Sequence, residues 1–202
     1  IEQRRKEIDL DKLVQRDRVH RSVYTDPEIF EFEMERIWGK AWIYVGHESQ
    51  VKEPGQYFTT TIARQPVVMT RHTDGKVYVL FNRCAHKGAE LVGDTCGKIK
   101  EFLCCYHGWR FHLDGTLLSI PLEKGYDGSG FGREDPKSNM QRVPRFDSYR
   151  GFVFASLSKE GPDLKTWLGG VASSIDNMAD RAPDGELEVT GGAFRYEHDS
   201  NW

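Results

Sequence analysis

Two short runs decide how this sequence is interpreted: Cys84-Ala85-His86 and Cys104-Cys105-Tyr106-His107. Each run pairs one cysteine with one histidine, and seventeen residues separate His86 from Cys104. Each run follows a predicted β-strand, so each is expected to form a turn at a strand end. Two such turns at one end of a β-domain can bring thiolate and imidazole ligands together around metal.

The residue types leave two kinds of metal centre open at this point. A structural zinc ion would take all four side chains as ligands of one metal. A [2Fe–2S] cluster can instead be held with two cysteines on one iron and two histidines on the other. Visible colour distinguishes the two, because an iron–sulfur centre absorbs visible light and zinc does not.

The other cysteines and histidines give weaker signals. His112 lies five residues after His107, but its position directly after Phe111 favours a histidine of a strand over a ligand. Cys105 is expected to be a buried or partly buried thiol without a role, and Cys96 a loop or core residue. Surface or core placement is the default for the remaining histidines, which are His20, His47, His72 and His198.

Composition and charge exclude several classes of protein. The 202 residues are 38% hydrophobic and 29% charged, with a net charge of −3 and a pI near 6.2. No basic field suggests nucleic acid, and apolar runs such as 77–81 and 151–157 are too short to span a bilayer. The first twenty residues are charged and lack the apolar core of a signal peptide. Four cysteines suit metal binding in a reducing compartment, so we expect a cytoplasmic protein without membrane or nucleic-acid partners.

Residues 1–39 are predicted to form an N-terminal arm followed by a helix. Thr25 or Asp26 can cap the helix, Pro27 suits its first turn, and Gly39 is a plausible end. The apolar residues of this segment recur at helical spacing. They are Phe30, Met34, Ile37 and Trp38.

Residues 40–157 are predicted to form a small antiparallel β-sandwich or barrel. Short segments with alternating or continuous apolar residues are separated by turn signals such as Asp74-Gly75 and Asp114-Gly115. Residues 122–142 are rich in polar residues and glycine, and predict a long loop. The predicted strands are 42–47, 56–63, 67–72, 76–82, 98–103, 110–113, 116–120 and 151–157.

Residues 158–202 are predicted to begin a second unit. Apolar residues from Leu164 to Met178 repeat at helical spacing, and residues 186–198 alternate as strands do. We therefore expect an α+β chain: a mainly β domain, flanking helices, and the first elements of another α+β domain.

The two runs and their neighbours resemble the cluster loops of Rieske proteins. Residues 82–91 contain Cys84-Ala85-His86-Lys87-Gly88, and residues 104–115 contain Tyr106-His107-Gly108-Trp109. The second loop, with the later Asp114-Gly115, is similar to that of the oxygenase branch in particular.

The flanks extend this resemblance. Ile37-Trp38, Trp42 and Val45-Gly46-His47 resemble the entry into the Rieske domain of ring-hydroxylating oxygenases, and Asn201-Trp202 resembles the start of their catalytic domain. From about Asp26 onward, the chain is similar to the N-terminal part of the α (large) subunit of Rieske non-heme iron aromatic ring-hydroxylating dioxygenases.

The resemblance implies a Rieske-type [2Fe–2S] cluster held by the cysteines and histidines of the two runs. Two positions depart from the usual pattern, because Cys105 replaces a proline and Lys87 replaces an arginine. Lysine keeps the charge but loses the bidentate geometry of arginine. The four implied ligands are Cys84, His86, Cys104 and His107.

Three further positions bear on the kind of Rieske cluster. Respiratory Rieske proteins join their loops by a disulfide, and the matching positions here are Ala89 and Tyr106. They also carry a serine hydroxyl where this chain has Trp109. With fewer donors to the cluster, the resemblance predicts a low reduction potential, about −150 mV at the bottom of the Rieske range.

The implied function is that of an oxidoreductase. A reductase or ferredoxin would supply electrons to the cluster, which would pass them to a mononuclear Fe(II) that activates O₂ to hydroxylate an aromatic compound. Overall similarity favours an aromatic carboxylate as that compound. The chain lacks a His/His/carboxylate site, since His198 and Asp199 have no partner histidine. No catalytic residue is therefore predicted, and the mononuclear iron is expected in a missing catalytic domain.

The resemblance also implies an α₃ ring, or an α₃β₃ assembly with a small β subunit. Electrons would then cross an interface, from the equivalent of His107 to a bridging aspartate of a neighbour. Two alternatives stay open: a Rieske monooxygenase or O- or N-demethylase, and a stand-alone Rieske ferredoxin. An Asp-x-x-His-x-x-x-x-His run beyond Trp202 would favour an oxygenase.

Overall fold

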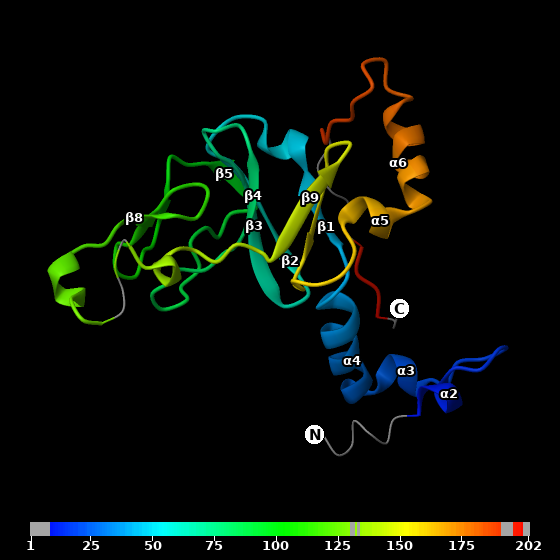
Figure 1. Cartoon of the computed structure of the whole chain (residues 1–202). Helices are drawn as coiled ribbons and strands as arrows, with labels where there is room; N and C mark the ends of the chain where they lie inside the picture. Colours follow the sequence, from blue (N-terminus) through cyan, green and yellow to red (C-terminus); the bar gives the residue numbers. More distant parts are fainter. Residues whose placement is uncertain (1–8, 130–131, 133, 191–195, 200–202) are drawn as a thin grey trace.

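The computed structural model describes residues 9–129, 132, 134–190 and 196–199. Three antiparallel sheets dominate it (Figure 1), which confirms the predicted mainly β fold with flanking helices. Within the described residues, no helix has the length and apolar character needed to cross a membrane.

A four-stranded sheet forms the middle of the β-domain. Its order is β4-β3-β2-β5, and its two hairpins turn at Ala63-Arg64 and Asp74-Gly75. Gly75 has a φ of 81°, a left-handed conformation that glycine adopts without strain. The strands are β2 (Gln56–Ile62), β3 (Gln65–Arg71), β4 (Val77–Phe81) and β5 (Cys96–Lys98).

One face of this middle sheet packs on a three-stranded sheet of order β1-β10-β9. Val67 and Met69 of β3 and Val79 of β4 are fully buried there, together with Val153 of β10. The strands are β1 (Ile43–His47), β9 (Arg145–Tyr149) and β10 (Phe152–Ser156).

The other face covers a second core beneath a small sheet of order β6-β7-β8. Val68 of β3 and Leu80 of β4 point to this side, because side chains alternate along a strand. In Figure 1 the hairpin of β8 lies on one side of the middle sheet, and α5 and α6 lie on the opposite side. The small strands are β6 (Phe102–Leu103), β7 (Arg110–Phe111) and β8 (Leu117–Ser119).

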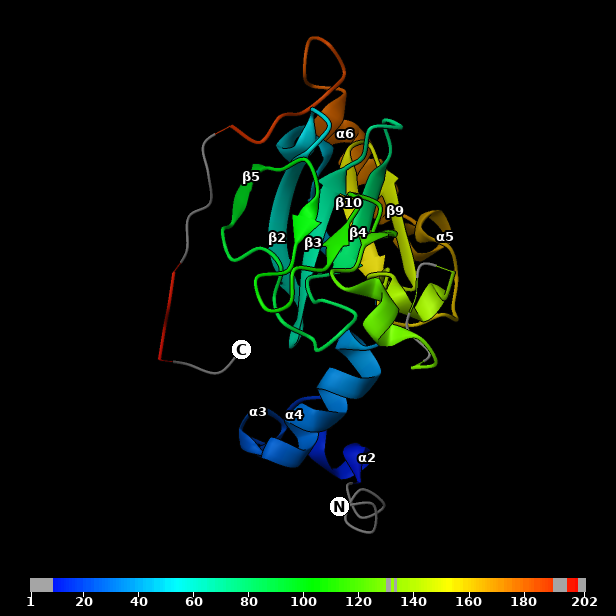
Figure 2. The same cartoon turned by 90° about the vertical axis from the view of Figure 1, so that its left-hand side faces the viewer.

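Helices flank the β-domain at two places. In Figures 1 and 2, α2 (Leu10–Leu13), α3 (Ser22–Thr25) and α4 (Pro27–Glu33) project from one end of the sheets. The side chain of Asp26 accepts a hydrogen bond from the Glu28 backbone N–H, which confirms the predicted cap. The helix continues as the π-helical η1 (Met34–Trp38) and ends at Gly39.

The single helix predicted around residues 163–178 is two helices. The helices α5 (Leu164–Leu168) and α6 (Val171–Ala179) are separated by Gly169-Gly170, and Gly169 has a φ of 48°. Leu164, Leu168 and Ile175 pack on Trp42.

Three other predictions differ from the structure. The strand predicted over 98–103 is split, because β5 pairs with β2 whereas β6 pairs with β7 in another sheet. Strand β9 was not predicted. The strands predicted over 186–198 do not form in the described residues 186–190 and 196–198, and residues 191–195 lie outside the described part, as do Asn201-Trp202.

The loop predicted over 122–142 carries two short 3₁₀ helices. These are η3 (Glu123–Tyr126) and η4 (Pro136–Ser138). His47 begins a third, η2 (Glu48–Val51), at the end of β1.

Candidate metal centre

Loop 1, residues 84–89, follows β4 and carries the first Cys–His pair. The backbone N–H of Cys84 donates to the Ala89 carbonyl oxygen over 2.8 Å, and the Gly88 N–H donates to the Cys84 carbonyl oxygen over 2.9 Å. Gly88 has a φ of 74°, which lets the chain reverse within this tight turn. The turn therefore fixes the backbone from which His86 projects.

Loop 2, residues 104–109, follows β6 and repeats this pattern. The Cys104 N–H donates to the Trp109 carbonyl oxygen over 2.8 Å, and the Gly108 N–H donates to the Cys104 carbonyl oxygen over 3.0 Å. Gly108 has a φ of 70°, which matches the glycine of loop 1. Two loops of the same design thus present one cysteine and one histidine each.

The buried Asn82 holds the segment that follows loop 1 in place. Its side-chain oxygen accepts from the backbone N–H groups of Leu91 and Val92, and its Nδ2 donates to the Val92 carbonyl oxygen over 2.7 Å. Nδ2 also donates to the Glu90 carboxylate over 3.1 Å. Sequence reasoning missed this role, because only the fold shows that a polar residue at a strand end is buried.

We expect Asn82→Ala to destabilise the protein by about 1–3 kcal/mol, since it leaves buried backbone groups without their partner. Thermal unfolding would measure this loss, and the visible absorbance of cluster-loaded protein would report whether loop 1 loosens. Asn177→Ala is the matched control, because Asn177 is exposed on α6. Equal effects of both changes would contradict the role of Asn82.

The two sulfur atoms lie side by side in the core beneath the small sheet. Cys84 and Cys104 are 3% and 2% exposed, lie in the same core cluster, and interact electrostatically with each other. Burial raises the pKa of the Cys84 thiol to about 11, and Cys104 acts in the same direction. The backbone N–H groups of His86 and Lys87 act against this shift. A bound cation offsets such a penalty, because a metal holds its cysteine ligands as thiolates.

The two imidazoles also lie together, closer to the surface. The ring centroids of His86 and His107 are 4.7 Å apart. His86 is half-buried and stacks on the buried Trp109, at 4.9 Å and an interplanar angle of 2°. Burial, and then the neighbouring His107 and Lys87, lower the pKa of His86. His107 is exposed, with Tyr106 against its ring.

The four side chains are therefore grouped by ligand type, with sulfurs inside and imidazoles outside. Two separate pairs match a cluster whose two irons each take two protein ligands, whereas zinc needs all four on one ion. The donor set thus fits the mixed-ligand [2Fe–2S] cluster.

The weaker candidates lie apart from this arrangement. His112 is exposed, and its backbone N–H donates to the Thr116 carbonyl oxygen in the β7–β8 hairpin. The prediction that Cys96 is a loop or core residue is wrong, because it lies on β5 with its side chain exposed. The prediction that Cys105 is buried or partly buried is wrong, because loop 2 turns outward directly after Cys104 and exposes this thiol.

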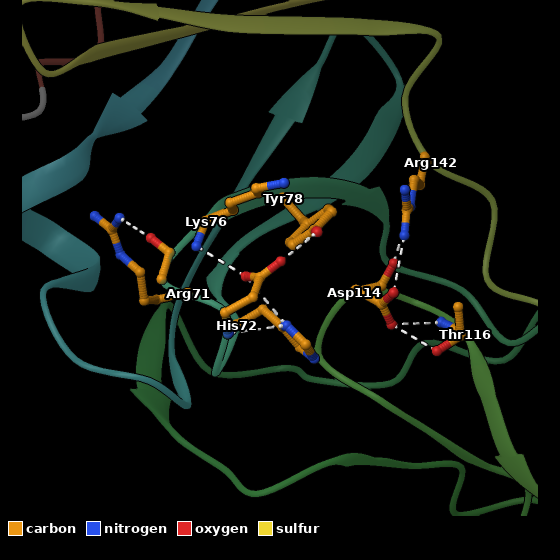
Figure 3. A network of polar contacts seen from close by, with 9 residues as sticks. Arg71, His72, Lys76, Tyr78, Asp114, Thr116 and Arg142 are labelled. Atoms are coloured by element: carbon orange, nitrogen blue, oxygen red, sulfur yellow. Dashed lines mark hydrogen bonds and ion pairs between the residues drawn. The ribbon is translucent and has the colours of Figure 1, made fainter.

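A polar network joins the small sheet to the middle sheet (Figure 3). Asp114, in the β7–β8 hairpin, accepts from the Thr116 N–H and hydroxyl and pairs with Arg142 over 2.9 Å. The Arg142 guanidinium lies 4.7 Å from the ring centre of Tyr78, whose hydroxyl donates to Asp74. The network joins the β7–β8 hairpin to β4.

Protonating Asp114 should weaken this junction. Burial raises the pKa of Asp114, but the hydrogen bonds from Thr116 and the charge of Arg142 outweigh it, so the pKa lies below the usual 3.8. A lowered pKa contributes stability above the unfolded-state value and loses it as the pH falls through the folded-state value.

We therefore expect Asp114→Asn to lower the Tm at neutral pH by about 2–4 °C, the effect of about 1 kcal/mol in a chain of this size. The difference from wild type should shrink as the pH falls below 3.8. Thermal unfolding over a pH series measures it, and a difference that stays constant into that acid range would contradict the account.

Comparison with known proteins agrees with this geometry. Residues 41–144 match the model of the Rieske [2Fe-2S] domain family, and these residues contain both loops. The chain is 38% identical over 199 residues to the toluate 1,2-dioxygenase subunit alpha of Pseudomonas putida, covering 96% of this chain and 44% of that one. It is 38% identical to the 2-halobenzoate 1,2-dioxygenase large subunit of Burkholderia cepacia, covering 92% of this chain and 40% of that one.

Solved structures show the same relationship. A naphthalene 1,2-dioxygenase from Rhodococcus sp. bound to indole superposes with a TM-score of 0.79 at 29% identity, covering 87% of this chain and 39% of that one. The apo form of the quaternary ammonium Rieske monooxygenase CntA superposes with a TM-score of 0.72 at 30% identity, covering 79% of this chain and 45% of that one. This chain thus spans less than half the length of the relatives it matches. It belongs to the Rieske [2Fe-2S] domain family and corresponds to the N-terminal part of aromatic-ring dioxygenase α subunits.

Proposed function

We propose that Cys84 and Cys104 bind one iron of a Rieske [2Fe–2S] cluster and that His86 and His107 bind the other. The observation that carries this proposal is the pairing by type, with two buried thiols in one core cluster and two imidazole rings 4.7 Å apart. When bound, such a cluster accepts and releases one electron at a time.

The side chains around the proposed cluster leave one side of it open for electron transfer. Cys84 and Cys104 are enclosed by the core, and Trp109 covers one face of His86. His107 is exposed at the tip of loop 2, so it is the ligand through which an acceptor can be reached. The low potential proposed for this centre, about −150 mV, has support from Trp109, an apolar ring in place of a hydroxyl donor.

We infer that the whole protein is the α subunit of a ring-hydroxylating oxygenase. A reductase or ferredoxin would reduce the cluster, and a mononuclear Fe(II) in a further domain would use the electrons to activate O₂. Similarity to toluate and 2-halobenzoate dioxygenases supports an aromatic carboxylate as substrate. Naphthalene, benzene and biphenyl dioxygenases support aromatic substrates in general.

The domain boundaries belong to the same proposal. Residues 1–39 form the arm and helix, 40–157 the cluster domain, and 158–202 the beginning of the catalytic domain. Pairing of β10 with β1 supports counting the strands after residue 144 in the cluster domain. The names of the relatives as alpha or large subunits support an assembly of several subunits. We propose that it is an α₃ or α₃β₃ ring, in which His107 would face a neighbouring subunit.

A Rieske monooxygenase is the second candidate. The observation that favours it is the superposition on CntA, whose structures hold L-carnitine and gamma-butyrobetaine. Its TM-score is nevertheless lower than that of naphthalene dioxygenase, 0.72 against 0.79.

The test uses the gene extended beyond residue 202, expressed with its electron donor. Oxygen consumption coupled to conversion of benzoate-type acids into dihydrodiols would support the proposal. Conversion of quaternary ammonium compounds instead would support the monooxygenase. A reading frame that ends near residue 202, with reversible reduction but no oxygen use, would support a stand-alone carrier.

A further inference from the structure

The segment after β8 covers both cluster loops. We call residues 121–126 the cap segment. Pro121 packs closely on loop 2. Its Cγ lies 3.1 Å from the position that a Cβ atom on Gly108 would occupy. Leu122 then adopts a left-handed φ of 54°, which a non-glycine residue holds only when its surroundings impose it. The Gly125 N–H donates to the Leu122 carbonyl oxygen over 2.8 Å and closes the turn.

This turn places Tyr126 against loop 1. Its ring meets His86 edge-on, with centroids 5.7 Å apart and an interplanar angle of 80°. It meets Trp109 in the same manner at 5.7 Å and 78°, and its hydroxyl oxygen accepts a hydrogen bond from Trp109 Nε1 over 3.4 Å. His86 is therefore held by a stacked ring on one face and an edge-on ring beside it.

The two histidines consequently have different surroundings. His86 is half-buried between Trp109 and Tyr126, whereas His107 is exposed. Both belong to the same cluster in the function proposed above. The packing shields the His86 side of that centre from water and leaves the His107 side exposed to solvent.

We propose that Tyr126 is a positioning residue of the metal centre. It holds the His86 imidazole against Trp109 and keeps water from the iron that His86 binds, so that exchange with other molecules is confined to His107. This inference rests on the proposed cluster. Partners of a metal-bound imidazole fix its orientation, and the apolar shell around a centre sets its solvent access and potential.

The direction of the effect follows from charge. Reduction adds a negative charge to the centre, and water stabilises that charge better than an aromatic ring does. Tyr126→Leu should therefore raise the reduction potential. It should also speed loss of the cluster to an iron chelator about two- to tenfold, the range that one lost aromatic pair produces.

The experiment compares four proteins loaded with cluster: wild type, Tyr126→Leu, Tyr126→Phe and Tyr78→Leu. Tyr126→Phe keeps the ring and should retain most of the wild-type potential and cluster lifetime. Tyr78→Leu is the matched control, because Tyr78 packs partly buried on the same core but bonds to Asp74 rather than to Trp109. Redox titration, chelator kinetics and thermal unfolding are measured on each.

The proposal predicts that only Tyr126→Leu shifts the potential and speeds cluster loss, with rescue by Tyr126→Phe. It is overturned if Tyr126→Leu and Tyr78→Leu lower the Tm alike while potential and cluster lifetime stay at wild-type values. A wild-type chain that binds no cluster would instead refute the proposed function, so the two failures are distinguishable.

Discussion

Replacing Cys104 with serine should abolish the metal centre, leaving less than about a tenth of the wild-type iron and visible absorbance, since a serine hydroxyl is a poor ligand where soft thiolates are required. Cys104 is 2% exposed and lies in the same core cluster as the buried Cys84, so loss of this sulfur removes half of the buried pair. Iron and acid-labile sulfide analysis of the purified variant measures the effect.

Cys105 provides an internal control for this test, because it is a second cysteine one residue away. Cys105→Ser should retain full iron, since this thiol is exposed on the outer side of loop 2. A variant with both serines shows whether Cys105 substitutes for Cys104 when that ligand is lost. Loss of iron in Cys105→Ser with retention in Cys104→Ser would reverse the ligand assignment.

Trp109→Ala should have the largest effect on stability. The indole is fully buried, stacks on His86 and packs near Phe111, so its removal costs about 3–5 kcal/mol. A loss of that size lowers the Tm by about 10 °C in a chain of this length. It should also expose His86 and shorten the lifetime of the cluster.

Trp167→Ala is the control for Trp109→Ala. Trp167 is 49% exposed on α5, so its removal should change stability much less. Thermal unfolding of the two variants without cluster separates packing from metal binding, and unfolding with cluster adds the contribution of the centre. Similar Tm values for the two variants would contradict the structural role of Trp109.

The ligand loops were predictable from the sequence because their chemistry is local. A cysteine and a histidine two or three residues apart must lie in one turn, and the glycines that follow, Gly88 and Gly108, take the left-handed conformation such a turn requires. The alternation of Val67 and Met69 with Val68 also predicted a strand, and the fold adds that its two faces serve different cores.

Other features depend on contacts between distant residues and so escaped prediction. Strand β9 is half-buried and lacks a clear alternation, and its pairing with β10 defines it. The run 98–103 leaves one sheet and joins another, which its residue pattern does not reveal. Gly169-Gly170 is a sequence signal for a helix break that the prediction did not use, because it rested on the apolar repeat on either side.

The supporting residues of the site show the same limit. Asn82 and Tyr126 act on loop 1 through bonds and ring contacts that span eight or more residues of sequence. Neither carries a signal of its own in the sequence, because asparagine and tyrosine are common at strand ends and in loops. Only the fold brings Tyr126 to His86, and Asn82 to the residues that follow loop 1.

Mössbauer spectroscopy of the ⁵⁷Fe-loaded, reduced chain tests the central claim most directly. The pairing of two thiols and, separately, two imidazoles predicts two inequivalent irons in equal amounts, with the ferrous site on the histidine side. Two irons with the same all-sulfur surroundings, or a colourless chain that holds a single zinc ion, would contradict it.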